Sequence, residues 1–497
     1  MIVSFNTLTQ ERYIVPEVLD DSNNINEFLS NNKGKKVIVV QGLGFVGAVM
    51  SLVCANAVTK DYAVIGIDLP SKDTYWKIRS INEGVFPLIA DDPMITEFFE
   101  NTKKQGNFLA TYDSLAYNYA DVVIVDINLD VQKKSYTNRM LKNFNVDLRG
   151  FKSAIATIGK NCKEDIMVLV ETTVPPGTCI NVVKPILEEE LLKRDLSIKE
   201  YILGHSYERV MPGPEYIESI RSFPRVYSGV DARSADNIET FLKTIIDTEI
   251  CELTRLESTN ATEIAKVLEN SYRAMNIAFA VEWSRFAEEA GVNLYEIVNA
   301  IRVRKTHANL MYPGIGVGGY CLTKDPLLAS WARKSFFGSD SDLTMSINSV
   351  SVNDQMPIYA FNRLVEVFGN LTDKKVTFLG VSYRGDVGDT RFTPVEMLVN
   401  KVREGGATIK LHDPFVSYWQ EQLCNIESDL DMVLDASPDL VIISTGHSDY
   451  TKESTLQKLM AIAPTQIYDT IGLFNKEQIM TLQSRHKVSV LGRGDIN

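Results

Sequence analysis

The chain of 497 residues is 45% hydrophobic and 23% charged, which predicts a globular protein of about three domains and excludes disordered and fibrous chains. Its 51 basic and 64 acidic side chains give a formal net charge of −13, which opposes nucleic acid as a main partner, although a local pocket could still bind a nucleotide. The six cysteines include no Cys-x-x-Cys pair, so no metal site or disulfide framework is expected, and a reducing, cytoplasmic location fits best. No signal peptide or membrane span is expected, because no stretch approaches about 18 consecutive apolar residues.

Residues 1–34 form a polar extension, which we expect to be a loosely attached arm. A predicted strand at 36–40 leads into Gly42-x-Gly44-x-x-Gly47, then a helical pattern, then a second strand at 63–68. Helical stretches continue to alternate with strands, which are predicted at 122–125, 167–170 and 226–228. This alternation predicts a parallel sheet covered by helices on both faces, in a first domain over 35–250.

A central domain is predicted over 251–370, beginning with a helical signal from about Asn260 to Ala290. Asn260 and Glu263 form a capping-box pattern, and Gly291 is a natural stop. The apolar residues recur in steps of three and four at Ala261, Ala265, Leu268, Tyr272, Met275, Phe279, Trp283, Phe286 and Ala290. A helix of about 30 residues spans about 45 Å, so this stripe must face another domain or another subunit. We expect a domain connector that also builds a homodimer.

A second α/β unit is predicted over 371–497. Its expected elements are a strand at 375–380, a helix at 394–404, a strand at 407–412 that ends at Asp413, and a strand at 439–444 that leads into Thr445-Gly446-His447. The predicted fold class is therefore α/β, with two Rossmann-like doubly wound parallel sheets joined by a long central helix and a helical dimerisation core.

The glycine motif at 42–47 has the full context of a dinucleotide site, because it follows a strand, opens a helix and precedes Asp68 at the end of the next strand. Gly42 makes the tight turn, Gly44 lets the backbone approach a pyrophosphate, and Gly47 lets helix and strand pack closely. Phe45 and Val46 begin the helix whose N-terminal amides and dipole favour the phosphates. Asp68 can accept from both ribose hydroxyls and would repel a 2′-phosphate, which predicts NAD rather than NADP.

Cys321 is the one cysteine for which the sequence predicts chemistry. Four glycines in the seven residues before it permit close backbone approach to a ligand. A helix is predicted to begin after it, with Asp325 as the cap and Pro326 in the first turn. Lys324 and that helix end could favour the thiolate.

From about residue 36 to at least 470 the chain resembles the nucleotide-sugar 6-dehydrogenases, which act on UDP-glucose, UDP-N-acetylmannosamine or GDP-mannose. The motifs that carry the resemblance are Gly42–Gly47, Glu171–Thr178, Glu208–Gly213, Ala265–Asn270, Gly318–Cys321, Gly380–Arg384, Gly388–Arg391 and Thr445–His447. The resemblance implies an NAD-binding domain, a helical dimerisation core, and a C-terminal domain for the nucleotide half of the substrate. The implied reaction is a four-electron oxidation of the sugar C6 alcohol to a carboxylate, through a thioester on cysteine, with two NAD.

The resemblance also assigns roles to single residues. Cys321 corresponds to the nucleophile, and Glu208 to a glutamate linked to thioester hydrolysis. Lys266 and Asn270, four apart on one helix face, would stabilise the developing alkoxide, and Asp325 would move protons together with Lys266. The implied binding residues are Thr173 and Arg391 for NAD, Arg384, Gly318 and Gly319 for the nucleotide-sugar, and Arg304 or Lys305 for the neighbouring subunit's substrate. Arg384 and Arg391 could instead be structural ion-pair partners, Glu208 an ordinary surface residue, and His447 a satisfied loop histidine.

The pattern departs from the family in three places. Val125-Asp126-Ile127-Asn128 stands where relatives have a Val-x-Thr-Pro turn, so Asn128 is the one candidate for the position of the family threonine. Tyr207 replaces the family proline before Glu208. The markers for acetamido sugars and for UDP-glucose are mixed.

The sequence therefore predicts an NAD-dependent 6-dehydrogenase of a UDP-sugar, either UDP-glucose or a UDP-N-acetylhexosamine, that supplies surface polysaccharide precursors. Two alternatives stay open. One is a two-electron β-hydroxyacid dehydrogenase, which needs no thiol. The other is a nucleotide-sugar sensor or scaffold that binds UDP-sugar and NAD without turnover.

Overall fold

A computed structural model describes residues 2–6, 8–88, 92–207, 209–210, 213–435 and 437–496. The chain divides into two compact units. The first unit comprises Met1–Gln132, Asn145–Val267 and Trp331–Asp340, and the second comprises Lys133–Phe144, Leu268–Ser330 and Ser341–Asn497. Among the described residues, no helix is long and apolar enough to cross a membrane.

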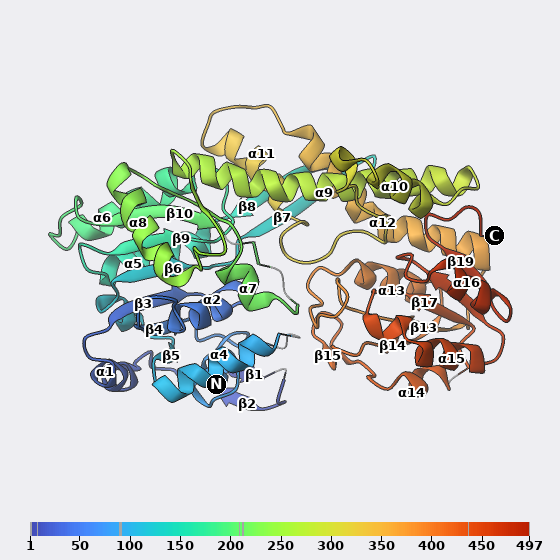
Figure 1. The fold of residues 1–497 in the computed structure, drawn as a ribbon, viewed down its shortest axis with the longest axis horizontal. Coiled ribbons are helices and arrows are strands. Elements are labelled where there is room, and N and C mark those ends of the chain that lie inside the picture. The colour runs from blue at the N-terminus through green and yellow to red at the C-terminus, as the bar shows by residue number, and fades with distance from the viewer. Residues whose placement is uncertain are drawn as a thin grey trace. The chain divides into compact units, whose positions relative to one another are not determined.

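The first unit is built on an eight-stranded sheet in the order β12-β11-β10-β9-β6-β3-β4-β5 (Figure 1). Its strands are β3 (Lys36–Gln41), β4 (Tyr62–Ile67), β5 (Phe108–Thr111), β6 (Val122–Val125), β9 (Met167–Val170), β10 (Ile202–Tyr207), β11 (Arg225–Gly229) and β12 (Leu253–Arg255). The strands from β10 to β5 run parallel, as the alternating sequence pattern predicts. The fully parallel sheet that we expected is wrong at one edge, because β11 pairs with β10 antiparallel and carries β12 with it.

Two groups of helices cover this sheet (Figure 1). One group is α2 (Phe45–Ala55), α4 (Pro93–Gln105) and α7 (Tyr216–Arg221), which pack on one another. The other includes α5 (Arg149–Asn161) and α6 (Lys184–Leu192), while α8 (Ala232–Ile245) packs on β10 and β11. Strands β3 and β4 are almost wholly buried and mostly apolar. This pattern is typical of a parallel strand that is covered by helices on both faces.

The N-terminal extension is ordered against the first unit, so the expected loose arm is wrong. It forms the antiparallel hairpin of β1 (Val3–Phe5) and β2 (Arg12–Ile14), followed by α1 (Ser22–Asn31). Val15 lies in the hydrophobic core of this unit, and Ile25 of α1 is fully buried. Asn32, after α1, donates to the carbonyl of Gly106 at 2.8 Å. The extension is therefore part of the domain in spite of its polar composition.

A second hairpin, β7 (Asp130–Thr137) and β8 (Met140–Asp147), follows β6 and was not predicted from the sequence. Its residues 133–144 belong to the second unit, where they pack on α12 (Thr344–Phe368). Lys133 forms an ion pair with Asp354 of that helix at 2.7 Å, and the Ser351 hydroxyl accepts from the Leu141 amide at 2.9 Å. This hairpin begins two residues after Asn128, the last residue of the segment that stands where relatives have the Val-x-Thr-Pro turn.

The second unit contains most of the long helix α9 (Thr259–Glu289), with α10 (Leu294–Arg302), the first half of α11 (Asp325–Ser335) and α12. Its sheet has five parallel strands in the order β14-β13-β17-β18-β19. These are β13 (Lys375–Leu379), β14 (Thr408–His412), β17 (Leu440–Ile443), β18 (Gln466–Asp469) and β19 (Lys487–Val490), with α13 (Pro394–Glu404), α14 (Leu430–Leu434), α15 (Glu453–Ala461) and α16 (Lys476–Gln483) beside them. Two Rossmann-like sheets and a long central helix are thus confirmed, and α9 begins and ends within one residue of the prediction.

Candidate active site

The glycine loop of the first unit has the geometry of a dinucleotide turn. Gly42 has a φ of +101°, and a Cβ there would lie 2.4 Å from the Asp126 carbonyl oxygen. A Cβ at Gly47 would lie 1.9 Å from the Gly42 carbonyl oxygen. At Gly44, the N-cap residue of α2, a Cβ would meet no described heavy atom within 4 Å. Two glycines therefore close the turn, and the third leaves open space at the N-terminus of α2, where a pyrophosphate fits.

Asp68 lies beside this loop at the carboxyl end of β4. Its carboxylate accepts from the Leu43 amide at 2.9 Å and from the Leu69 amide at 2.7 Å. Thr173 follows β9 on the same edge of the sheet, one residue after Thr172, whose hydroxyl donates to the Val125 carbonyl at 3.0 Å. The residues predicted to bind NAD in this unit thus share the carboxyl edge of one parallel sheet, where ligands of doubly wound folds bind. The open Gly44 position and this edge fit NAD.

Asn128 is exposed, two residues before the hairpin strand β7, and no described hydrogen bond fixes its side chain. Its proposed equivalence to the family threonine stays a prediction.

The beginning of α9 holds the loop of the Glu171–Thr178 motif. The Glu263 carboxylate accepts from the amides of Gly177 at 2.5 Å and Cys179 at 2.8 Å. The predicted capping box with Asn260 is therefore wrong, because the carboxylate serves a distant loop and not its own helix. Burial raises the pKa of Glu263 to about 7, although these backbone amides favour the charged form. One turn later the buried Lys266 ammonium lies 5.4 Å from the centre of the Tyr207 ring.

A polar cluster in the second unit gathers around the carboxylate of Asp325, which is fully buried at the start of α11. Asn270 of α9 donates to this carboxylate through its side-chain amide at 2.7 Å, and the Lys324 ammonium pairs with its other oxygen at 2.7 Å. The amides of Asp325 and Lys324 both donate to the Cys321 carbonyl, at 2.8 and 3.1 Å. The side chain of Cys321 itself is exposed. The turn that carries Cys321 is thus bonded to the backbone of Asp325, the residue whose carboxylate holds Asn270.

The glycines before Cys321 pack against the C-terminal sheet domain. A Cβ at Gly318 would lie 2.3 Å from Cβ of Tyr383, and one at Gly319 would lie 2.8 Å from the Tyr383 ring. These positions are therefore glycine because Tyr383 fills the space, and not because the space is open, as we expected from the sequence. Burial, followed by the charge of Asp389, raises the pKa of Tyr383 to about 12, so this phenol is neutral at ordinary pH.

The two arginines of the 380–391 turn differ. The Arg391 guanidinium forms a two-point ion pair with the buried Asp389, at 2.9 and 2.7 Å, so it has the structural geometry that we kept as an alternative. Arg384 is exposed and makes no ion pair within the described parts of the chain. Arg304, just after α10, is likewise exposed. Glu208 lies outside the described residues.

His447 of the Thr445–His447 motif is fully buried and bound on both ring nitrogens. Its Nε2 lies 3.0 Å from an Asp413 carboxylate oxygen, and its Nδ1 accepts from the Asp386 amide at 2.9 Å. The interpretation of a satisfied loop histidine is the one that this geometry supports.

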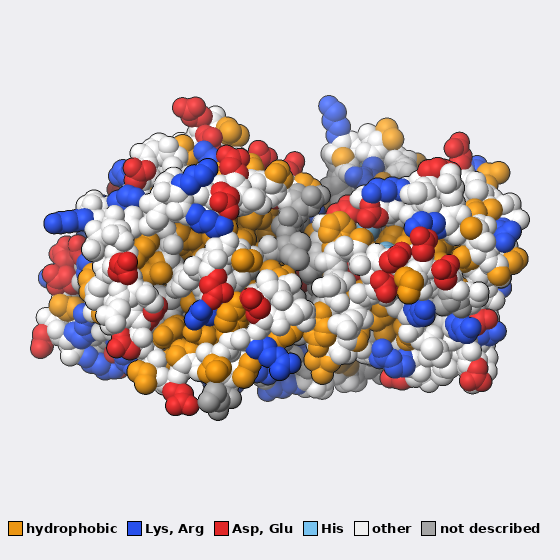
Figure 2. All heavy atoms as spheres, turned by 90° about the horizontal axis from the view of Figure 1, so that it is seen from below, with side chains coloured by type: hydrophobic (Ala, Val, Ile, Leu, Met, Phe, Trp, Pro, Cys, Tyr) orange, Lys and Arg blue, Asp and Glu red, His pale blue; other side chains and the backbone are white. Residues whose placement is uncertain are grey.

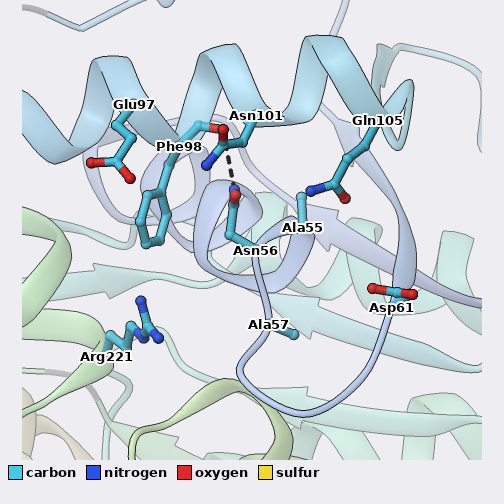
Figure 3. A pocket seen from close by; sticks show the side chains of 9 residues that line it. All are labelled: Ala55, Asn56, Ala57, Asp61, Glu97, Phe98, Asn101, Gln105 and Arg221. Carbon is cyan, nitrogen blue, oxygen red and sulfur yellow. Dashed lines mark hydrogen bonds between the residues drawn. The ribbon is translucent and has the colours of Figure 1, made fainter.

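Charged side chains of both signs are interspersed over the face of the molecule seen in Figure 2, in keeping with the moderate net charge of −13. A cavity of about 310 Å³ lies in the first unit, where the end of α2 meets α4 and Arg221. Figure 3 shows the side chains of Glu97, Asn101 and Gln105 reaching into it from α4. It lies at the end of α2 opposite to the glycine loop and includes no residue that the sequence assigns to the site. In the described ranges no group of acidic, histidine and cysteine side chains could hold a metal ion.

Sequence comparison matches three consecutive domains of one family. The NAD binding domain of the UDP-glucose/GDP-mannose dehydrogenase family matches residues 35–246, its central domain matches 260–354, and its UDP binding domain matches 377–476. The chain belongs to this family. It is an NAD-dependent nucleotide-sugar dehydrogenase.

Relatives of this nucleotide-sugar dehydrogenase match along almost their whole length. The UDP-N-acetyl-D-mannosamine dehydrogenase of Methanocaldococcus jannaschii is 28% identical over 475 residues, covering 93% of this chain and 98% of that protein. The crystal structure of an NDP-N-acetyl-D-galactosaminuronic acid dehydrogenase from Methanosarcina mazei superposes with a TM-score of 0.72 at 26% identity, covering 95% of this chain and 98% of that chain. The UDP-D-ManNAc dehydrogenase of Pyrococcus horikoshii, 24% identical, shares the fold with a TM-score of 0.75 over 93% of this chain and all of that chain (100%).

Two further residues, Lys324 and Glu263, were named from the sequence but assigned other contacts than the structure shows. Lys324 was noted as a possible influence on the thiol, whereas its ammonium pairs with Asp325 and lies 4.6 Å from the centre of the Tyr320 ring. Glu263 was taken for a helix cap, and it holds the 171–178 loop. The adjacency of Lys324 and Asp325 in the sequence is a signal that could have indicated their ion pair. Nothing local in the sequence indicates the contacts of Glu263.

Proposed function

We propose that this dehydrogenase oxidises the C6 alcohol of a UDP-sugar to the uronate through a covalent intermediate on Cys321. The observation that carries the proposal is the Asn270–Asp325–Lys324 cluster, in which the backbone amides of Asp325 and Lys324 also donate to the Cys321 carbonyl. A nucleophilic thiol, a proton carrier and an amide donor are the groups that such an oxidation needs within one site.

The proposed chemistry has three steps. The C6 hydroxyl loses its proton and carbon C6 loses a hydride, which leaves an aldehyde. The Cys321 thiolate adds to the aldehyde carbon, and loss of a second hydride from the resulting thiohemiacetal leaves a thioester. Water then cleaves the carbon–sulfur bond, which releases the carboxylate and regenerates the thiol. NAD, when bound, accepts one hydride in each of the two oxidations.

The other residues act on protons and charge. Asn270 donates a hydrogen bond to the alkoxide that develops at C6, and Lys266, one turn before it on α9, adds a positive charge. Asp325 holds Asn270 and Lys324 and carries protons to and from water. Glu208 assists hydrolysis of the thioester. The first unit binds NAD through Gly42, Gly44, Phe45, Val46, Gly47, Asp68 and Thr173.

For the substrate we propose a UDP-N-acetylhexosamine, with UDP-glucose as the second candidate. The match of residues 377–476 to a UDP binding domain supports the nucleotide, and the N-acetylated sugars named for two of the relatives support the hexosamine. The exposed Arg384 is suited to the diphosphate. Such a product is a building block for surface polysaccharides.

We also propose a homodimer, built on α9 and α10. Five apolar side chains of the second unit's part of α9 are 47–64% exposed: Leu268, Tyr272, Phe279, Trp283 and Phe286. The rings of Phe279, Trp283 and Phe286 contact one another in series, 5.9 and 6.0 Å apart, and form a continuous apolar face. A face of this kind on a chain that is otherwise well packed is typical of a subunit interface. In the dimer, Arg304 would reach the partner's substrate.

One assay tests the reaction. With excess NAD and a panel of UDP- and GDP-sugars, we expect two NADH for each sugar consumed. Cys321→Ser should reduce uronate formation by roughly a thousandfold or more and retain NAD and UDP binding. Cys424→Ser, which removes a cysteine far along the chain in β16 (Cys424–Asn425), is the matched control and should keep full activity. One NADH per sugar would indicate a two-electron dehydrogenase, no NADH would indicate a sensor or scaffold, and full activity of Cys321→Ser would exclude the thioester.

A further inference from the structure

The N-terminal hairpin is joined to the first unit through a buried hydroxyl. Ser4 of β1 is fully buried, and its Oγ makes two hydrogen bonds to a segment about 70 residues later. It donates to the Lys72 carbonyl at 2.8 Å and accepts from the Trp76 amide at 3.0 Å. Ser4 therefore spans the loop before α3 (Tyr75–Asn82) and the first turn of that helix.

The acceptor that Ser4 provides is one that α3 lacks locally. The N-cap residue of α3 is Thr74, but its hydroxyl donates to the Leu69 carbonyl and contacts the Ser71 hydroxyl at 2.7 Å. An amide in the first turn of a helix has no partner within the helix and needs an outside acceptor. Ser4 thus caps α3 from another part of the chain.

The loop that Ser4 holds begins at the carboxylate proposed for the cofactor ribose. The Leu69 amide donates to Asp68 at 2.7 Å. The Leu69 carbonyl accepts from the Ser71 amide at 2.9 Å and from the Thr74 hydroxyl. The Ser71 carbonyl in turn accepts from the Tyr75 amide at 3.1 Å. Hydrogen bonds linked through the backbone of residues 69–76 therefore connect Ser4 to Asp68.

The far end of α3 is also held by the hairpin. Tyr13 of β2 donates to Glu83, just after α3, at 2.8 Å, and the Arg79 guanidinium lies 5.5 Å from the centre of the Tyr13 ring. The hairpin is thus attached at both ends of α3, but only the Ser4 attachment includes the loop next to Asp68. This difference provides a control within the same hairpin.

We propose that the N-terminal hairpin is a positioning element of the cofactor site, in which Ser4 caps α3 and fixes the 69–74 loop so that Asp68 is presented to the adenosine ribose of NAD. Ser4 is a positioning residue and touches no ligand itself. The inference rests on the proposed placement of NAD at Asp68. It predicts that loss of the Ser4 hydroxyl weakens binding of the adenosine half of NAD and leaves the nucleotide-sugar half unchanged.

The test is the affinity of the full chain for ADP-ribose and for UDP, measured by calorimetry. Ser4→Ala should bind ADP-ribose about fivefold more weakly, the factor that corresponds to a typical lost helix cap, and should bind UDP as before. Ser4→Thr, which keeps the hydroxyl, should restore the affinity for ADP-ribose. Thr9→Ala, an exposed hydroxyl bonded to Glu11 within the same hairpin, should change neither affinity. In steady state, the KM for NAD should rise while kcat and the KM for the sugar stay constant.

Hydrogen exchange gives a second readout that needs no ligand. The Trp76 amide should exchange faster in Ser4→Ala and not in Tyr13→Phe, which loses the hydroxyl's bonds to Glu11 and Glu83 and leaves the Ser4 cap in place. Should Ser4→Ala not fold, the nearly isosteric Ser4→Cys offers a much weaker acceptor and takes its place. Unchanged ADP-ribose affinity in these variants, or failure of Ser4→Thr to restore it, overturns the inference. The cofactor placement is judged separately, because it fails if wild type does not bind ADP-ribose or if Asp68→Asn binds it as well as wild type does.

Discussion

The turns that follow the first strand of each α/β unit look alike in the order of their elements and differ in what they leave open. In the first unit the helix α2 begins inside the glycine motif, and the Cβ position of Gly44 faces empty space. In the second unit Gly380 has a φ of +99°, a Cβ there would lie 2.3 Å from the Thr445 Cβ, and helix α13 begins only at Pro394. The turn of the first unit has room for a pyrophosphate, whereas Thr445 occupies the corresponding space in the turn of the second unit.

The aspartates that end the second strand of each unit show the same contrast. Asp68 is partly exposed, whereas Asp413 is fully buried. One Asp413 oxygen accepts from the amides of Val381 and Ser382, from the Ser382 hydroxyl and from His447, and the other accepts from the Phe415 amide. A repeated strand–turn–helix–strand–Asp order therefore indicates a common fold, but it does not indicate a second dinucleotide site.

The contrast between the glycines should give the largest effects. Gly47→Ala and Gly380→Ala place a methyl group within 1.9 and 2.3 Å of neighbouring atoms, so each should lower the free energy of unfolding by about 3 kcal/mol. Gly44→Ala should change it by less than about 0.5 kcal/mol and still weaken NAD binding roughly tenfold, because its methyl occupies ligand space. Urea denaturation and NAD titration of the three variants check this. A folded Gly44→Ala that binds NAD normally would contradict the open turn.

Substitutions of the two aspartates, Asp68 and Asp413, should give the next largest effects. Asp413→Asn brings amide hydrogens towards groups that already donate, so it should cost roughly 3 kcal/mol of folding free energy. Asp68→Asn should leave stability within about 0.5 kcal/mol and lower the affinity for NAD roughly tenfold. Thermal melts with and without NAD separate the two outcomes. Equal destabilisation by both substitutions would mean that Asp68 is as structural as Asp413.

The elements that were predicted well are those whose signal is local. The strands at 122–125 and 167–170 and the helix at 394–404 agree with the structure at every residue, because apolar runs and capping residues are read within a few positions. The hairpin of β7 and β8 was missed because β7 is mostly polar and the apolar residues of β8 are interrupted by Lys142, Asn143 and Asn145. Helix α12 was not predicted, and Pro357 in its interior would argue against a continuous helix.

The candidate site divides in the same way. Asn270, Asp325 and the Cys321 turn were predicted from motifs, and the structure brings them together in the second unit. The reason for Gly318 and Gly319 was wrong, because the ring that fills their space, Tyr383, lies more than sixty residues later in the sequence. The sequence shows that a position carries a glycine. Only the folded structure shows whether that glycine faces a ligand or another side chain.

The contributions of two buried carboxylates, Glu263 and Asp413, to the free energy of unfolding should change with pH in opposite directions. The expected size lies between that of the glycine and aspartate substitutions and that of the arginine substitutions. The folded-state pKa of Glu263, about 7, lies above its ordinary value of 4.5, so the folded state binds the extra proton. Its contribution is therefore greatest below pH 4.5, and the free energy of unfolding falls by up to about 1.4 kcal/mol per unit as the pH rises towards 7. Burial alone would raise the pKa of Asp413, but His447 and backbone amides hold it below 3.8, so its contribution is lost on acidification.

Denaturant titrations at several pH values test the first of these directions. Glu263→Gln should remove part of the slope between about pH 5 and 7, while Glu282→Gln, an exposed position on the same helix, should not. Other buried carboxylates such as Asp469, whose burial raises its pKa to about 6, contribute to the wild-type slope, so the difference between variant and wild type is the quantity to compare. An identical slope in Glu263→Gln would contradict the assignment.

The smallest effect on folding is expected at Arg384. Among the described residues of 380–391, it is the one basic side chain without an ion pair. Arg384→Gln should leave the free energy of unfolding within about 0.5 kcal/mol and weaken UDP binding roughly tenfold, because an exposed guanidinium gives little to folding and much to a diphosphate. Arg391→Gln leaves the buried Asp389 without its two-point partner, so it should cost about 1–2 kcal/mol of stability. Calorimetry with UDP and thermal melts of both variants, beside the surface control Arg403→Gln, distinguish a ligand-binding arginine from a structural one in the same turn. If Arg384→Gln binds UDP normally, the diphosphate must be bound elsewhere in the second unit, and the turn after β13 is then structural throughout.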